Sequence, residues 1–179
     1  GDWRNEITLL ADDVDRSTEA VLQEDMEFIA DQIKGNKPTF NIKKLYADAF
    51  PQEKSAGGDL YPGVNEGLNN SVEQGSMLIN YFGHGGEDGW GGERFLDISQ
   101  IKSWQNYDKL PLIITITCDF TRFDNPDKFS GGEEVIVSPY GGAAAMISTT
   151  REIFISYGRS LNKSLMPNLL GFTGQDYSI

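Results

Sequence analysis

Short apolar runs alternate along this chain with stretches of helical periodicity, and this alternation limits the folds open to it. Apolar runs of six to eight residues, each predicted to form a strand, lie at residues 6–11, 40–47, 77–82, 112–117 and 143–148. Apolar strands of this length separated by helices are typical of parallel βαβ units, in which helices cover both faces of the sheet. The sequence therefore predicts an α/β sandwich with a mainly parallel sheet flanked by helices.

Helical patterns occupy several of the gaps between the predicted strands. After Ser17, a residue type that caps helices, four apolar residues recur at spacings of four, three and four: Leu22, Met26, Ile29 and Ile33. A second helix is predicted to begin at Pro62 and to end at Gly75. Residues 98–104 are predicted to form a third, shorter helix.

Size and charge exclude several classes of protein. The chain has 179 residues, which is typical of one domain. Fifteen Lys and Arg against 27 Asp and Glu give a net charge of −12, which repels phosphate backbones, so no nucleic-acid partner is expected. No apolar run reaches the ~20 residues of a membrane-spanning helix, so no transmembrane segment is expected. Neither end resembles a targeting signal, and we interpret residues 1–179 as one domain excised from a larger multidomain protein.

The chain contains one cysteine, Cys118, and one histidine, His84. These counts exclude intrachain disulfides and zinc sites built from Cys and His. Each residue directly follows a predicted strand, and ligands of parallel sheets bind at the carboxyl ends of the strands. The pattern favours a thiol and its imidazole base facing one cleft. The N–H of Gly85 is the expected donor to an oxyanion, with the N–H of Cys118 as a second.

Less specific interpretations of the same residues stay open. A lone cysteine at a strand end is often a small buried apolar residue, and a lone histidine in a glycine loop is often a polar surface group. The glycines around His84 lack the third glycine of a dinucleotide fingerprint, so no cofactor is expected for catalysis. Asp12, Asp13 and Asp15 supply the ligand type that a structural calcium ion prefers, and the alternative is a solvated loop near a helix N-terminus. Trp90 follows His84 closely enough to line a cleft.

Several segments resemble a known family. The segments are residues 80–91 (Asn-Tyr-Phe-Gly-His-Gly-Gly-Glu-Asp-Gly-Trp-Gly), 117–118 (Thr-Cys), 119–126, 130–133 and 144–150. Together they resemble the gingipain family of cysteine peptidases, within the caspase-like clan, over about residues 5–160. The segments after the cysteine resemble in particular the sortases of the type IX secretion system. The resemblance implies a caspase-like three-layer sandwich.

The resemblance also implies roles for single residues. Cys118 matches the nucleophile, His84 the general base, and the Gly85 backbone the oxyanion donor. Gingipains place an acidic residue after the first strand to orient the histidine, and here that place falls on Asp13, with Asp12 as an alternative.

The resemblance implies substrate-binding residues as well. They are Trp90, Phe154 at the place of a pocket tryptophan, and Thr149 beside the specificity pocket. Ala20 stands where arginine-specific relatives carry an acidic pocket residue, so specificity for arginine is not expected.

For function, the resemblance implies an endopeptidase and transpeptidase at the bacterial cell surface, on the extracellular face of the outer membrane. Such an enzyme removes C-terminal signal domains from secreted cargo and transfers the acyl group to an amine of anionic lipopolysaccharide, together with other type IX secretion components. Two alternatives stay open. One is a catalytically inactive caspase-like module that binds cargo or assembles the secretion machinery, and the other is a general gingipain-like protease.

Overall fold

The computed structural model describes residues 1–55 and 58–172 and is built around a five-stranded sheet. The strand order is β10-β9-β5-β1-β2, and every neighbouring pair is parallel. The strands are β1 (Glu6–Ala11), β2 (Asn41–Tyr46), β5 (Leu78–Phe82), β9 (Leu112–Ile116) and β10 (Ala145–Ser148). All five coincide with the predicted apolar runs to within two residues at either end, which confirms the parallel α/β prediction.

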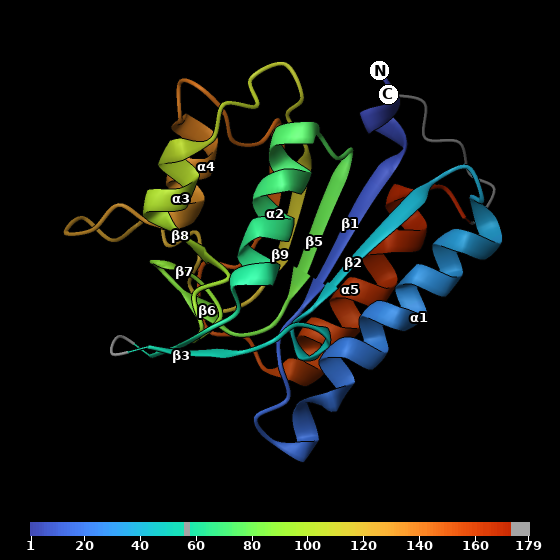
Figure 1. Ribbon diagram of the computed structural model, residues 1–179, viewed down its shortest axis with the longest axis horizontal. Helices are drawn as coiled ribbons and strands as arrows, with labels where there is room; N and C mark the ends of the chain where they lie inside the picture. Colours follow the sequence, from blue (N-terminus) through green and yellow to red (C-terminus); the bar gives the residue numbers. More distant parts are fainter. Residues whose placement is uncertain (56–57, 173–179) are drawn as a thin grey trace.

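Helices cover both faces of this sheet (Figure 1). On one face lie α1 (Ala20–Asn36) and α5 (Ile155–Leu169), and on the other lie α2 (Pro62–Gln74), α3 (Ile98–Ser103) and α4 (Gly131–Val137). The buried apolar residues form two clusters, one between the sheet and each helical layer. The chain therefore has the predicted three-layer architecture.

The predicted apolar face of the first helix is buried. Leu22, Met26, Ile29 and Ile33 are at most 2% exposed and lie in the cluster beneath α1. Helix α2 begins at Pro62, as expected from its fixed backbone angle, and is followed by Gly75 at a φ of +97°. At that φ a residue with a Cβ is strained, so Gly75 suits the turn into β5.

Helices α4 and α5 were not among the sequence predictions. Helix α4 begins with a capping box, in which the Ser130 backbone N–H donates to the Glu133 carboxylate and the Ser130 hydroxyl accepts from the Glu133 N–H. Helix α5 packs against α1, where Arg159 and Lys163 both bind the buried carboxylate of Asp25. Residues 155–169 therefore complete the helical layer that α1 alone would leave half open.

The remaining elements are short. One small antiparallel sheet pairs β3 (Glu53–Ser55) with β4 (Gly58–Leu60), and a second contains β6 (Gly85–Gly86), β7 (Gly89–Trp90) and β8 (Leu96–Asp97). Single 3-10 turns lie at Asp2–Asn5, Ser17–Glu19 and Ala47–Ala49. Among residues 1–55 and 58–172, no helix has both the length and the apolar character needed to cross a bilayer.

Candidate active site

Strand register brings the single histidine and the single cysteine to the same edge of the sheet. Phe82 of β5 is paired with Ile116 of β9, and the N–H of Gly83 still donates to the Ile116 carbonyl at 3.3 Å. His84 and Cys118 each follow that pair by two residues. Because neighbouring strands are ~4.8 Å apart, equal offsets from an in-register pair bring the two residues to the same edge of the sheet.

Both residues line one small cavity of about 40 Å³ at the ends of these strands. Its other walls are mainly apolar and come from α1, from the strand ends and from the start of α5: Leu22, Phe82, Gly83, Ile116, Ile153 and Ile155. The Cys118 Sγ lies 3.9 Å from the Ile153 carbonyl oxygen, to which it donates a weak hydrogen bond. The Cys118 thiol and the His84 imidazole therefore share one mostly apolar cavity.

The carboxylate against the histidine ring belongs to Glu19. Its Oε1 lies 3.4 Å from His84 Nε2, and its side chain is only 7% exposed. Glu19 directly precedes α1, and its Oε2 accepts a hydrogen bond of 2.9 Å from the Arg16 backbone N–H. That bond fixes the carboxylate, and the fixed carboxylate lies against the imidazole ring.

The structure corrects the expectation that Asp13, or alternatively Asp12, orients this ring. The Asp13 carboxylate accepts from the Tyr61 hydroxyl at 3.1 Å, on the α2 face of the sheet, whereas the ring of His84 meets Glu19 at the start of α1. Asp12 contacts the backbone of His84 and not its ring, because its Oδ2 accepts the His84 N–H at 2.6 Å. The chain turns after β1, so the Asp13 carboxylate lies on the α2 side of the sheet, away from the histidine ring.

Sequence reasoning missed Glu19 although a local signal was present. Residues 16–19 form a turn in which the carboxylate at the fourth position returns to the backbone of the first. An acid three residues past the start of such a turn is typical of a capping box at a helix N-terminus. The signal gives the carboxylate's place on the helix, and only the tertiary fold brings it to His84.

The backbone of Gly85 lies against the residue that precedes the cysteine. A Cβ added to Gly85 would lie 2.5 Å from Thr117 Oγ1 and 2.7 Å from the Gly89 carbonyl oxygen, so a side chain does not fit there. The glycine therefore allows the main chain after His84 to lie against the Thr117 side chain, next to Cys118. The N–H of Gly85 stays the predicted oxyanion donor.

Comparison with known proteins agrees with this geometry. The model of peptidase family C25 matches residues 1–178. The chain belongs to peptidase family C25. It is thus a gingipain-like cysteine peptidase domain, and peptidases of this family need no cofactor.

Solved structures of this family share the fold. The complex of Porphyromonas gingivalis RgpB pro- and mature domains has a TM-score of 0.72 at 18% identity, over 94% of this chain and 38% of that chain. The Arg-specific cysteine proteinase gingipain R has a TM-score of 0.68 at 18% identity, over 93% and 38%. The C25 domain thus spans well under half of each relative. No curated protein matches the sequence.

The three predicted substrate-binding residues of this C25 domain differ in exposure: Trp90 is buried, Thr149 is half-buried and Phe154 is exposed. Trp90 is fully buried, stacks on Tyr81 with ring centroids 4.6 Å apart and is out of reach of a substrate, which corrects that expectation. Thr149 uses its hydroxyl to bind the Thr117 carbonyl, next to the cysteine. Phe154 is exposed at the start of α5, and its ring lies 6.2 Å from that of Tyr157.

Acidic side chains gather behind the histidine loop of the C25 domain. One carboxylate oxygen from each of Asp12, Asp13 and Glu93 lies within 4.8 Å of the others. Burial raises the pKa of Asp12 to about 7, and burial also raises the pKa of Asp13 and of Glu93. Asp15, which was expected to share a calcium ion with Asp12 and Asp13, is not part of this group, whereas Glu93 is. A calcium ion here stays a prediction.

A larger open cavity of about 610 Å³ lies beside His84. It is lined mostly by the histidine loop and β7, including the glycines at positions 85, 86, 89, 91 and 92. Main chain without side chains leaves room for another main chain to approach closely. This cavity therefore has a lining that suits the main chain of an extended peptide next to the candidate imidazole.

Proposed function

We propose that this chain is the catalytic domain of a cysteine endopeptidase in which Cys118 is the nucleophile and His84 the general base and acid. The observation that carries the proposal is that both residues, each the single one of its type, line one cavity at in-register strand ends. Membership of peptidase family C25 supports the same assignment.

In the first half-reaction the Cys118 sulfur attacks the carbonyl carbon of the scissile peptide bond, and His84 accepts the thiol proton. Negative charge develops on the carbonyl oxygen, where the Gly85 N–H donates a hydrogen bond. The C–N bond then breaks, His84 gives its proton to the leaving amine, and a thioester joins the substrate to Cys118. Glu19 lies at Nε2, which leaves Nδ1 of His84 for these proton transfers.

In the second half-reaction an amine or water attacks the thioester carbonyl. His84 accepts a proton from the attacking group, the C–S bond breaks, and the thiolate takes the proton back. Water gives hydrolysis, whereas an amine gives transpeptidation. Glu19 supports both halves because its carboxylate lies against Nε2 of His84 and fixes the orientation of the ring.

We further propose that the enzyme acts as a type IX secretion sortase of the PorU type. In that role it removes C-terminal signal domains from cargo at the bacterial cell surface and passes the acyl group to an amine of lipopolysaccharide, alongside other components of the secretion system. The sequence features that support this are the segments at 119–126 and 130–133, together with Ala20 at the place of the arginine-pocket acid.

The cavity beside the thiol supports a preference for small apolar side chains before the cleaved bond. Its volume of about 40 Å³ is little more than that of one water molecule, and no acidic side chain lines it. A long cationic side chain would find neither space nor a counter-charge. Phe154, exposed next to Ile153, supplies an apolar surface for substrate residues further along the chain.

A catalytically inactive binding module is favoured by one observation. The hydrogen bond of the Cys118 thiol goes to the Ile153 carbonyl and not to His84. In a module that only binds cargo signals, the thiol would be a half-buried side chain of this kind.

The two functions are separated by replacing the nucleophile in the full-length protein in its own cells. Cys118→Ser keeps the shape of the side chain and removes the thiol, and immunoblots of secreted cargo measure whether the signal domain is removed. If the catalytic proposal is right, cells that contain the variant at the same level as the wild-type protein should accumulate cargo that keeps its signal domain. Normal processing by Cys118→Ser would exclude catalysis by this thiol and leave the binding module.

A further inference from the structure

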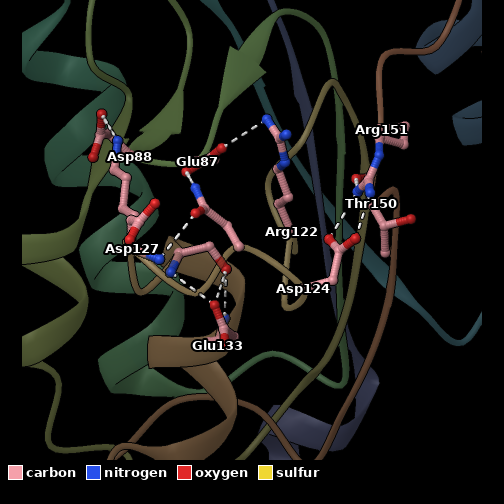
Figure 2. Close-up of polar contacts among 11 residues, drawn as sticks. Glu87, Asp88, Arg122, Asp124, Asp127, Glu133, Thr150 and Arg151 are labelled. Atoms are coloured by element: carbon pink, nitrogen blue, oxygen red, sulfur yellow. Dashed lines mark hydrogen bonds and ion pairs between the residues drawn. The ribbon is translucent and has the colours of Figure 1, made fainter.

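The loop that carries His84 and the loop that carries Cys118 are tied together by one carboxylate, that of Glu87. Arg122 Nη1 donates to Glu87 Oε1 at 3.1 Å, and Asn125 Nδ2 donates to Oε2 at 3.0 Å (Figure 2). The Glu87 carbonyl oxygen also accepts from the Gly131 N–H at 2.7 Å, at the first residue of α4. Glu87 thus makes three hydrogen bonds to residues 122–131, which follow the cysteine.

The Glu87 side chain is partly buried, which distinguishes these contacts from an exposed ion pair. Its side chain is 14% exposed, although its partner Arg122 is half-exposed. Both carboxylate oxygens are used, so loss of Glu87 would leave Arg122 and Asn125 without their shared acceptor. A partly buried carboxylate that uses both of its oxygens fixes geometry more firmly than an exposed ion pair does.

A neighbouring ion pair offers a natural comparison. Lys128 Nζ donates to Asp88 Oδ2 at 2.7 Å and joins the same two loops, but both side chains are exposed. Exposed pairs of this kind contribute roughly 0–1 kcal/mol because water solvates each partner well. Removal of the Lys128 charge therefore tests the loss of one contact between these loops while the contacts of Glu87 with Arg122 and Asn125 stay in place.

Each loop is held independently on its other side. The His84 N–H donates to Asp12, and the His84 carbonyl oxygen accepts from the Tyr81 hydroxyl at 2.6 Å. The cysteine loop is attached to the segment after β10 by the Thr121 N–H, which donates to the Thr149 carbonyl at 3.2 Å, and by the Arg151–Asp124 ion pair (Figure 2). Glu87 lies between these two anchored segments and joins them.

We propose that Glu87 is a positioning residue that sets the separation of the His84 imidazole and the Cys118 thiol. The inference rests on the proposed function, since it assigns to Glu87 the alignment of that catalytic pair. Glu87 touches neither reacting group. It acts because it fixes the loop three residues after the histidine against the loop four to seven residues after the cysteine.

The single cysteine makes the test specific, because iodoacetamide alkylation reports on Cys118 alone. Rates are measured by mass spectrometry at pH 7 and at pH 9.5 for the wild type, Glu87→Ala, Arg122→Gln, Lys128→Gln and His84→Ala. Glu87→Ala and Arg122→Gln are expected to react at least fivefold more slowly than the wild type at pH 7. At pH 9.5, where a free thiol of pKa ~8.5 ionises without a base, all variants are expected to react alike. Lys128→Gln is expected to match the wild type at both values.

The outcomes separate the two proposals. If His84→Ala slows alkylation at pH 7 and both Glu87→Ala and Arg122→Gln react like the wild type, the positioning role is overturned and the Cys–His pair stands. If wild type and His84→Ala react alike, the catalytic proposal and the positioning role both fail. Near-ultraviolet circular dichroism checks that each variant is folded, and if Glu87→Ala does not fold, the rate of Arg122→Gln decides.

Discussion

The contact between α1 and α5 depends on a buried carboxylate whose removal should have a measurable cost. Asp25 is 2% exposed, and its oxygens accept from Arg159 Nε at 2.6 Å and Nη2 at 3.0 Å, and from Lys163 Nζ at 2.6 Å. Burial alone would raise the pKa of Asp25, but the hydrogen bonds from Arg159 and Lys163 outweigh it and lower the pKa below the ordinary 3.8. The perturbation we consider is Asp25→Asn.

The structure sets the size of the expected effect. Breaking a buried ion pair from one side costs about 3–5 kcal/mol when the remaining charge stays buried. Here the side chains of Arg159 and Lys163 are 37% and 34% exposed, so both cations can turn toward water after the change. We therefore expect a loss of about 3 kcal/mol in the free energy of unfolding, which is a fall of about 9 °C in Tm for a chain of this length.

The effect should depend on pH in a defined direction. A carboxyl whose pKa is lower in the folded than in the unfolded state stabilises the fold fully above the unfolded pKa, and that stabilisation is lost as pH falls through the folded pKa. Thermal unfolding followed by circular dichroism should thus show the full gap between wild type and Asp25→Asn at pH 6, narrowing below about pH 4. Asp31→Asn, on the exposed side of α1, is the matched control. A Tm within 2 °C of the wild type at pH 6, or a gap that widens in acid, would refute the reasoning.

Three further predictions concern the site. In EDTA, the free energy of unfolding of the wild type should fall by up to about 4 kcal/mol as pH rises from 4 to 7, because burial disfavours the ionised form of Asp12 and raises its folded pKa to about 7. Thermal melts of Asp12→Asn should show a weaker dependence of stability on pH, and equal pH dependence in the two proteins would contradict the prediction. If the carboxylates of Asp12, Asp13 and Glu93 hold calcium, millimolar CaCl₂ should raise Tm at pH 7.5, and Glu93→Gln should abolish this rise in Tm. An equal rise in Tm for the variant would place the ion elsewhere. Peptides with alanine before the cleaved bond should be cut at least tenfold faster than those with leucine, and Ile155→Ala, which enlarges the cavity, should reduce that ratio; a preference for arginine would contradict the cavity argument.

The sheet could be predicted from the sequence because its strands are continuous apolar runs buried on both faces. Helix α5 could not, since its buried face is formed partly by Gly158 and Asn162, which break the apolar periodicity. Asn162 is tolerated there because its Oδ1 accepts a hydrogen bond of 2.8 Å from Asn80 Nδ2 on β5. A polar pair of this kind is visible only once the helix lies on the sheet.

At the site, the residues that sequence alone could assign are those that follow a strand directly. His84 and Cys118 are placed by β5 and β9, so their positions follow from the strand pattern and the parallel register. The acid that contacts the histidine ring, Glu19, is placed by the reversal of the chain between β1 and α1. The family resemblance had assigned the orienting role to Asp13, or alternatively to Asp12, directly after the strand. Trp90 was misassigned for a related reason. Its closeness to His84 in sequence does not say which way its side chain points, and in the structure the side chain is buried in the core.

The side of the sheet, more than distance along the chain, explains which residues serve this site. Alternate residues of a strand face opposite layers, and Phe82 and Ile116 both belong to the cluster on the α1 and α5 side. His84 and Cys118, two residues further on, open into the cavity on that same side, where Glu19 and Leu22 arrive from the start of α1 and Ile153 and Ile155 from the start of α5. The walls of the cavity are thus the ends of two helices held together by Asp25, so loosening that contact should widen the cavity as well as lower the stability. A stability change at Asp25 that left peptide selectivity untouched would show that the helix ends are fixed by the loops alone.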